Sequence, residues 1–257
     1  MSAIEPRHQK VREIYRDETL WILDKPAGIL SHPNPPATRA SNTLIRGTYD
    51  FQRELYRIEV PGGRQQQVHM VHRLDQETSG LIICTFFPEA AMLLKEALYR
   101  GELEKEYRAL VVGAPRAQRG QWEDCLRKTP RRGDVAVEVV RGEPNATTRF
   151  EVLERIGDQL ALLALRPETG RTHQLRVQSS SRGYPIAGDE RYGDFAANRF
   201  LAAEIGLRHM FLHAFRVRFR HPRSGHLLRF EAPFTSRLAG PLEKARQLRK
   251  LVPRRSR

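Results

Sequence analysis

A candidate catalytic carboxylate lies in a polar segment that directly precedes an apolar segment. Asp75 lies within the polar segment from Val71 to Gly80, and the apolar run from Leu81 to Phe86 follows at once. Polar residues at the mouth of a core strand are often functional, because the scaffold fixes them while the adjoining loop gives access. Taken alone, Asp75 fits a turn or capping carboxylate better than a catalytic one.

Two other chemistries are open to the same segment. His69 and His72 precede the carboxylate, but residues three apart near a strand point to opposite faces, which disfavours a shared metal ion. Ser79 with His72 lacks the Gly-x-Ser-x-Gly turn of a hydrolase nucleophile. The segment therefore predicts no metal site and no serine nucleophile.

A second polar segment, Glu168–Arg176, contains a glycine turn that opens a predicted helix. Backbone N–H groups at such a turn attract phosphate, and Arg171 adds to that attraction. Arg176 falls on the helix face shared with Thr172 and His173. An ordinary amphipathic helix with solvated arginines remains an equal alternative.

A third segment, Glu104–Val111, places Tyr107 at the start of a predicted strand. An aromatic residue there is ordinarily a core or cross-strand residue. The spacing by itself assigns it no chemistry.

The charge of the chain favours a polyanionic partner. Lys and Arg number 44 against 30 Asp and Glu in 257 residues, a formal net charge of +14, and Arg supplies most of the excess. The planar guanidinium suits phosphate oxygens, so nucleic acid is the leading partner, although a basic surface can also serve solubility alone.

Two cysteines, Cys84 and Cys125, cannot form a disulfide framework or a four-cysteine zinc site. The charged N-terminus lacks the apolar core of a signal peptide, and no apolar run could span a bilayer. We expect a cytoplasmic protein that does not enter a membrane.

The elements that must position these segments are mostly strands. Strands that follow one another directly favour an α+β fold, a mixed and largely antiparallel sheet with flanking helices. The predicted strands are Thr19–Asp24, Gly80–Phe86, Tyr107–Val112, Val135–Val140, Thr147–Ile156, Leu160–Leu165, Met210–Arg220 and Leu227–Glu231. The predicted helices are Glu89–Arg100, one from a Thr172 cap to Arg182, and Ser236–Leu251. Residues 31–66 are predicted to be a long loop with at most one short helix.

Together the three segments resemble the motifs of the RluA family of RNA pseudouridine synthases. The family's His-Arg-Leu-Asp-x-x-Thr-Ser-Gly-Leu stands at His72–Leu81, its Lys-x-Tyr at Lys105–Tyr107, and its Thr-Gly-Arg-Thr-His-Gln-Leu-Arg at Thr169–Arg176. Asp24–Gly28 and Pro185–Gly193 also agree, in the family's order. The resemblance spans about residues 19–235, with residues 1–18 as a polar arm or edge strand and 236–257 as a basic C-terminal helix and tail.

The resemblance implies an enzyme that isomerises uridine in structured RNA, either an rRNA hairpin or a tRNA. Asp75 would be the essential carboxylate, Arg176 its partner, and Tyr107 the aromatic that stacks on the flipped base. We expect no cofactor, no metal and a monomeric protein without the S4-type RNA-binding domain of many relatives. The expected RNA contacts are Arg73, His72, Arg171 and His173.

The chain also departs from the family pattern. Gln178 and Ser179 replace a usual His and apolar residue, and Tyr184 replaces a common His. These positions lie outside the three catalytic segments, so they bear on substrate rather than on activity. The alternative function is a non-catalytic RNA-binding or ribosome-assembly protein on the same fold, and a metal-dependent nuclease is a weaker one.

Overall fold

The chain forms two compact units. The structure is a computed structural model that describes residues 11–39, 42–131 and 134–248, with the backbone alone for residues 130, 131 and 134. Unit 1 comprises residues 1–104 and Ala214–Ala232, and unit 2 comprises Lys105–His213 and the residues from Pro233 onward.

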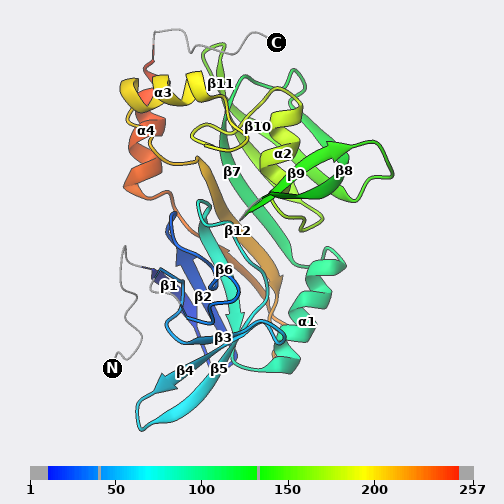
Figure 1. Cartoon of the computed structure of the whole chain (residues 1–257), viewed down its shortest axis with the longest axis vertical. Helices are drawn as coiled ribbons and strands as arrows, with labels where there is room; N and C mark the ends of the chain where they lie inside the picture. The colour runs from blue at the N-terminus through cyan, green and yellow to red at the C-terminus, as the bar shows by residue number, and fades with distance from the viewer. Residues whose placement is uncertain (1–10, 40–41, 132–133, 249–257) are drawn as a thin grey trace. The chain divides into compact units, whose positions relative to one another are not determined.

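Unit 1 is an antiparallel sheet with one helix among its described residues (Figure 1). Its elements are β1 (Arg12–Arg16), β2 (Leu20–Lys25), β3 (Thr48–Asp50), β4 (Leu55–Val60), β5 (Arg64–Met70), β6 (Ser79–Thr85), α1 (Pro88–Tyr99), most of β12 (Leu212–Arg220) and β13 (Leu227–Glu231). Strands β3, β4, β5, β6, β2 and β1 pair in that order, and β12 pairs with β13.

The centre of unit 1 is the pair β2–β6, in which every residue is buried. Leu20, Ile22, Leu81 and Ile83 form a core cluster with residues of α1 and β12. Gly80 begins this ladder at a φ of +109°, and a Cβ there would lie 2.3 Å from the carbonyl oxygen of Ala214. Only glycine fits where the Asp75 segment enters β6.

The prediction of a loop over residues 31–66 is wrong for its second half. Strands β3 and β4 lie within it, and β4 pairs with β5 in a hairpin that turns at Gly62 and Gly63, both with positive φ. Backbone hydrogen bonds between strands need no apolar side chains, so the polar run Gln65–Gln67 gave no sign of a strand. The two adjacent glycines of the turn were the signal that could have predicted the hairpin.

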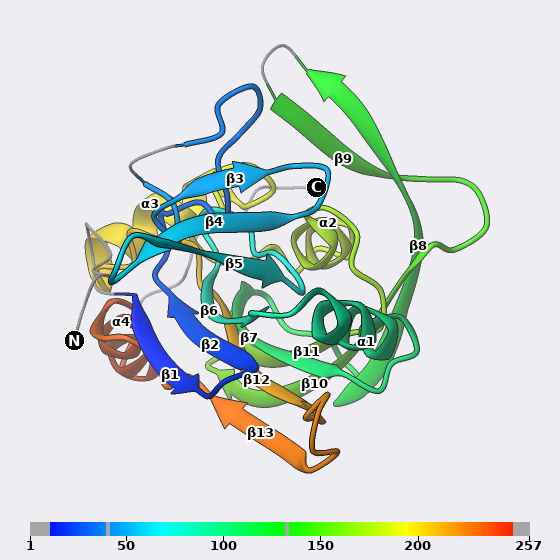
Figure 2. The ribbon, with the colours of Figure 1, turned by 90° about the horizontal axis from the view of Figure 1, so that it is seen from below.

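Unit 2 is built from antiparallel strands with three helices among its described residues. Its elements are β7 (Glu104–Val112), β8 (Arg119–Arg131), β9 (Asp134–Val140), β10 (Ala146–Ile156), β11 (Leu160–Pro167), α2 (Gln174–Ser181), α3 (Phe195–Glu204) and α4 (Ser236–Arg246). The strand order is β7-β11-β10-β8-β9. β8 pairs with β10 through its first half and with β9 through its second half, so the β8–β9 hairpin extends beyond β10 (Figure 2).

Helices α3 and α4 cover an apolar cluster of unit 2. Leu201 of α3 and Leu238 and Leu242 of α4 pack with Leu110 and Leu162 of the sheet. The C-terminal helix therefore contributes to the core of unit 2.

Both units confirm the α+β expectation, and the predicted strands and α1 stand within a few residues of their predicted bounds. The prediction missed β8 and α3, although Asp194 caps α3 by accepting from the N–H groups of Ala196 and Ala197. The Thr172 cap is wrong: the N-cap is His173, in the left-handed conformation and without a side-chain cap bond. Of the predicted arm, residues 12–16 form edge strand β1, and residues 1–10 lie outside the described residues. Helix α4 ends at Arg246, and residues 249–257 of the predicted helix and tail also lie outside the described residues.

Candidate active site and RNA-binding surface

Asp75 lies half-buried on the loop between β5 and β6 in unit 1. Its two neighbours in the chain are fixed by the turn that follows β2. The Ser31 hydroxyl donates to the Leu74 carbonyl at 2.8 Å and accepts from the Leu74 N–H at 3.0 Å. On the other side, the Gly28 N–H donates to the Gln76 carbonyl at 2.9 Å. The backbone on both sides of Asp75 is therefore held in place.

Lys25 completes this support from inside the unit. The residue has no exposed surface, and its Nζ donates to the carbonyls of Ile29, Gln76 and Pro26 at 2.8, 2.9 and 3.0 Å. An ammonium has three N–H donors, so these three carbonyls match its full capacity. A buried cation thus ties the turn after β2 to the residue that follows Asp75.

The charge balance around Lys25 involves Asp75 directly. Burial lowers the pKa of Lys25 to about 7, while the charges of Glu77, Asp75 and Asp24 act in the opposite direction. Lys25 is a candidate supporting residue that the sequence analysis did not select, although it lies in the Asp24–Gly28 segment that resembles the family.

The two residues predicted beside Asp75 to contact RNA differ in exposure. Arg73 is exposed, and its Nη1 lies 2.8 Å from Nε2 of His32. His72 is buried, and its Nε2 accepts from the N–H of Ile83 in β6. The burial of His72 favours a structural role over the predicted contact with RNA.

Tyr107 and Arg176 belong to unit 2. Tyr107 lies on β7, buried, opposite Leu165 of β11. Two residues earlier on the strand, burial lowers the pKa of Lys105 to about 8. The structure thus places the Lys-x-Tyr segment on a strand, as predicted.

Arg176 on α2 forms a buried ion pair with Asp189, a residue that sequence reasoning did not select. Its Nε donates to Oδ2 of Asp189 at 2.8 Å, and its Nη2 donates to Oδ1 at 2.9 Å. Burial alone would raise the pKa of Asp189, but the hydrogen bonds and charge of Arg176 outweigh it, and the pKa is lowered. The pairing of Arg176 with Asp75 stays a prediction, since the two residues lie in different units.

The start of α2 brings His173 against Tyr192. Nδ1 of His173 lies 2.9 Å from the Tyr192 hydroxyl, which also accepts from the N–H of Val137 in β9. The guanidinium of Arg176 lies 5.2 Å from the centre of the Tyr192 ring. Tyr192 therefore joins the Arg176 helix to the β8–β9 hairpin.

The predicted phosphate-binding turn is partly occupied from within. The N–H of Arg171 donates to the side-chain oxygen of Gln174, and the Arg171 guanidinium donates to the carbonyl of Asn145. The side chain of Arg171 is exposed, and the Asn145 carbonyl that it binds carries no negative charge. Its charge is thus available to phosphate even though its backbone N–H is used.

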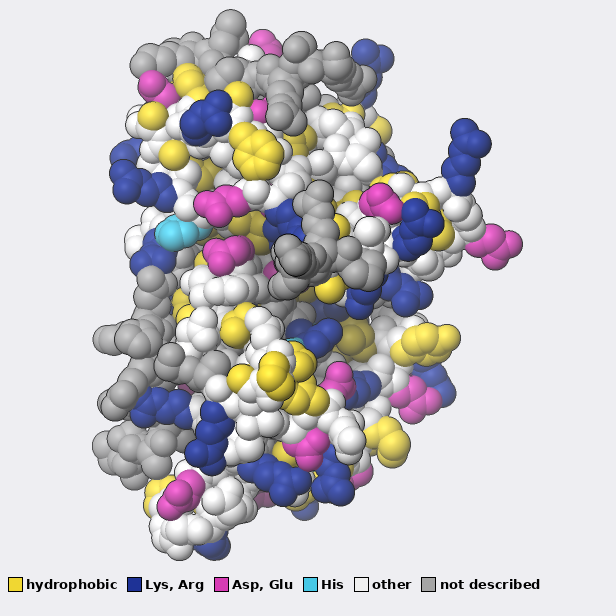
Figure 3. Space-filling model, viewed as in Figure 1, with side chains coloured by type: hydrophobic (Ala, Val, Ile, Leu, Met, Phe, Trp, Pro, Cys, Tyr) yellow, Lys and Arg dark blue, Asp and Glu magenta, His cyan; other side chains and the backbone are white. Residues whose placement is uncertain are grey.

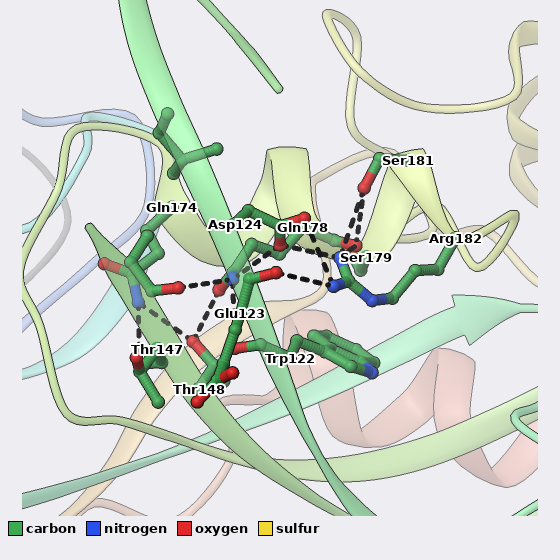
Figure 4. A network of polar contacts seen from close by, with 12 residues as sticks. Trp122, Glu123, Asp124, Thr147, Thr148, Gln174, Gln178, Ser179, Ser181 and Arg182 are labelled. Atoms are coloured by element: carbon green, nitrogen blue, oxygen red, sulfur yellow. Dashed lines mark hydrogen bonds and ion pairs between the residues drawn. The ribbon is translucent and has the colours of Figure 1, made fainter. Parts of the chain in front are cut away.

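Gln178, one of the departures from the family pattern, is the centre of a buried polar network (Figure 4). Its Nε2 donates to Asp124 at 2.8 Å and to the carbonyl of Ala146 at 3.1 Å, and its Oε1 accepts from the Thr148 hydroxyl at 2.6 Å. Gln174 donates to the same hydroxyl at 2.9 Å. The two glutamines bind α2 to β8 and β10, so the replacement has a structural reason.

The comparison with known proteins identifies the family. The family described as RNA pseudouridylate synthase matches residues 19–181. The chain belongs to this family. It is an RNA pseudouridine synthase, and hence an isomerase.

Sequence alignments with several relatives extend over nearly the whole length of this synthase. The ribosomal large subunit pseudouridine synthase C of Escherichia coli (strain K12) is 34% identical over 261 residues, which cover 96% of this chain and 75% of the relative. The protein of the same name from Haemophilus influenzae is 34% identical over 242 residues, covering 91% of this chain and 68% of the relative.

Solved structures agree with the fold of the synthase. Human RNA pseudouridylate synthase domain containing 4 aligns with a TM-score of 0.67 at 22% identity, covering 91% of this chain and 92% of that one. Human RNA pseudouridylate synthase domain containing 1 aligns with a TM-score of 0.63 at 25% identity, covering 89% and 86%.

Many arginines of the synthase are neutralised by neighbours. On the face drawn in Figure 3, Lys and Arg side chains are spread among Asp and Glu side chains. Arg216 and Arg218 of β12 form ion pairs with Glu231 at 2.7 Å and Glu104 at 2.8 Å. These pairs make them weaker candidates for RNA contact than Arg171 or Arg73.

Within residues 11–39, 42–131 and 134–248, no three His, Cys, Asp or Glu side chains gather in a way that could hold a metal ion. In the same residues, no helix is both long enough and apolar enough to cross a bilayer.

Proposed function

We propose that this synthase converts uridine to pseudouridine in large-subunit ribosomal RNA, with Asp75 as its essential carboxylate. The observation that carries the proposal is the support of Asp75, whose two neighbours are fixed by Ser31 and by the buried Lys25. Precise fixing of the backbone beside one half-buried carboxylate is what a catalytic group requires. The two bacterial relatives are synthases of the large ribosomal subunit, which favours ribosomal RNA over tRNA as the substrate.

The reaction needs only rearrangement of the substrate. The bond from C1′ to N1 breaks, the base rotates, and a bond from C1′ to C5 forms, while C5 loses a proton and N1 gains one. Substrate and product contain the same atoms in the same oxidation state, so we propose that no cofactor takes part. Asp75 acts either by attacking the uracil or the sugar, or by removing the 2′ proton of the ribose.

Both routes need an ionised carboxylate against an RNA base. Burial raises the pKa of a carboxyl group, and nearby cations lower it. In this proposal Arg176 is the partner of Asp75, and Asp189 holds the guanidinium in position through two hydrogen bonds. Tyr107 stacks on the target base and takes part in removing its C5 proton.

A uridine inside a helical stack cannot reach these groups, so we propose that the base is flipped. Arg73, exposed two residues before Asp75, fills the vacated space. Arg171 and His173 contact phosphates beside the target. The enzyme acts as a monomer, and a ribosomal substrate places its action in the cytoplasm.

The proposal is tested with RNA that carries 5-tritiated uridine. Wild-type enzyme should release tritium from large-subunit ribosomal RNA transcripts and release little from tRNA transcripts. Release of tritium from tRNA alone would overturn the assignment of ribosomal RNA as the substrate. RNA binding without release from either RNA would favour the non-catalytic alternative. Mapping pseudouridines in total RNA of a deletion strain then identifies the target position.

A further inference from the structure

The side chain of His32 is bound at both ring nitrogens, and the partners fix its protonation. Nδ1 lies 2.7 Å from the carbonyl oxygen of Pro33, and Nε2 lies 2.8 Å from Nη1 of Arg73. A carbonyl only accepts and a guanidinium only donates. His32 is therefore the neutral tautomer with its proton on Nδ1 and a lone pair directed at Arg73.

Aromatic contacts hold the ring in this orientation. The ring of Tyr49 stacks on His32 with centroids 4.7 Å apart and an interplanar angle of 8°, and Phe51 meets it edge-on at 5.9 Å. Tyr49 is buried and packs in turn on Tyr56. Stacking on the buried Tyr49 therefore holds the imidazole in one orientation within unit 1.

The surroundings favour the neutral ring. Burial lowers the pKa of His32 and the charge of Arg73 lowers it further, while the Pro33 carbonyl and Glu54 act in the opposite direction. Tyr49 is not a competing anion, because burial raises its pKa to about 12. Arg73 and Glu54 are the charged groups that act on His32, and the titratable Tyr49 is stacked on its ring.

The contact between His32 and Arg73 involves a residue two positions before Asp75. Ser31 fixes the backbone of Leu74, and the next residue, His32, binds the side chain of Arg73. One turn thus holds both residues that precede Asp75. An exposed arginine otherwise samples many rotamers, and ordering it before binding removes part of that entropic cost from the complex.

We propose that His32 is a positioning residue that holds the Arg73 guanidinium ready for contact with RNA. The proposal rests on the function proposed above, in which Arg73 fills the space of the flipped base. Neutral His32 orients Arg73, whereas protonated His32 has no lone pair to offer and repels the guanidinium.

Two substitutions separate the hydrogen bond from the ring. His32→Phe keeps an aromatic ring on Tyr49 but removes the acceptor, and we expect kcat/KM for tritium release to fall roughly 10-fold. His32→Gln places an amide oxygen near the position of Nε2, and we expect it to retain most of the activity. The matched control is His226→Phe, at an exposed histidine in the turn between β12 and β13, which should be unchanged.

Two further readouts exclude a merely structural effect. In an Arg73→Ala background, His32→Phe should cause no additional loss. Wild-type activity should fall toward acid pH with an inflection that His32→Gln lacks. A loss in His32→Phe that persists in full without Arg73, or an unchanged acid limb in His32→Gln, would overturn the proposal.

The tautomer is measurable without catalysis. Nitrogen-15 spectra of wild-type protein should show the proton of His32 on Nδ1, and Arg73→Gln should raise the pKa of His32. A proton on Nε2 would contradict the proposal even in an active enzyme. If the spectra agree while wild-type enzyme forms no pseudouridine, the proposed function fails and the contact between His32 and Arg73 stands.

Discussion

The loop that carries Asp75 and the helix that carries Arg176 are held by opposite means. The Asp75 loop is fixed at its backbone, where Lys25 and Ser31 bind the carbonyls of Gln76 and Leu74. Helix α2 is fixed through side chains, because Asp189 binds the Arg176 guanidinium itself and Gln178 binds neighbouring strands.

The difference shows which kind of change each region tolerates. A backbone support positions a loop whatever side chain it carries, so Asp75 can be replaced without moving its neighbours. A side-chain support is specific to the residue that it binds, so Arg176 cannot be changed without leaving Asp189 as a buried charge. Substitutions in the two regions should therefore differ in their ratio of lost stability to lost activity.

The largest effect on stability should come from Asp189→Asn. It leaves the buried Arg176 guanidinium without its carboxylate, and we expect the free energy of unfolding to fall by about 3–5 kcal/mol. Urea denaturation measures the change. Glu138→Gln, at an exposed ion pair with Arg127, is the control and should cause no measurable change.

The pH dependence sharpens the same test. The pKa of Asp189 is lowered below its ordinary value of 3.8 in the folded protein, so its contribution is present above that value and is lost as the pH falls through the folded pKa. The stability difference between wild type and Asp189→Asn should shrink in acid. A difference that is constant down to low pH would mean that the carboxylate charge is not the source.

Lys25→Met should have the next largest effect. Three carbonyls lose their charged donor, and we expect a loss of about 1.5–3 kcal/mol in the free energy of unfolding together with a marked fall in kcat. Lys95→Met, at the surface ion pair with Glu54, is the control. A stable and fully active Lys25→Met would show that the Asp75 backbone does not depend on the buried ammonium.

Gln178→Leu should be milder. It leaves the Thr148 hydroxyl and Asp124 without one partner each, and we expect a loss of about 1–2 kcal/mol, measured by thermal unfolding. Gln121→Leu, at an exposed glutamine on β8, should change little. Equal effects from the two glutamines would argue against the buried network as the anchor of α2.

The smallest effects concern arginines at the surface. Arg171→Gln should lower the salt dependence of RNA affinity by about one phosphate contact, whereas Arg218→Gln should lower it less, because Glu104 neutralises Arg218. Titrations at several salt concentrations give the slopes. A larger change in the Arg218 variant would place the RNA on the β12 face.

The sequence could locate the three candidate segments because their residue types and order are distinctive. It could not predict the contacts that hold them, since Lys25 and Asp189 bind partners 51 and 13 residues away in the chain. The same limit applies to His32, whose role depends on Arg73, 41 residues later. Such long-range contacts form only in the folded chain, so the local sequence does not reveal them.

The secondary structure also contains elements that the sequence could predict and elements that it could not. Apolar strands such as β6 and β11 could be located from composition, because burial selects their side chains. Strands β4, β5 and β8 carry many polar side chains and take their structure from ladder bonds to neighbours. The left-handed His173 at the start of α2 likewise depends on Tyr192, beyond the reach of local propensity.

The most direct test of the account is Asp75→Asn. The substitution keeps the shape of the side chain and the backbone bonds at Leu74 and Gln76 while removing the charge. We expect RNA binding to be kept, a small loss of stability because the carboxylate charge favours the buried Lys25 ammonium, and no release of tritium from RNA that carries 5-tritiated uridine. Appreciable turnover by this variant would contradict the assignment of Asp75 as the essential carboxylate.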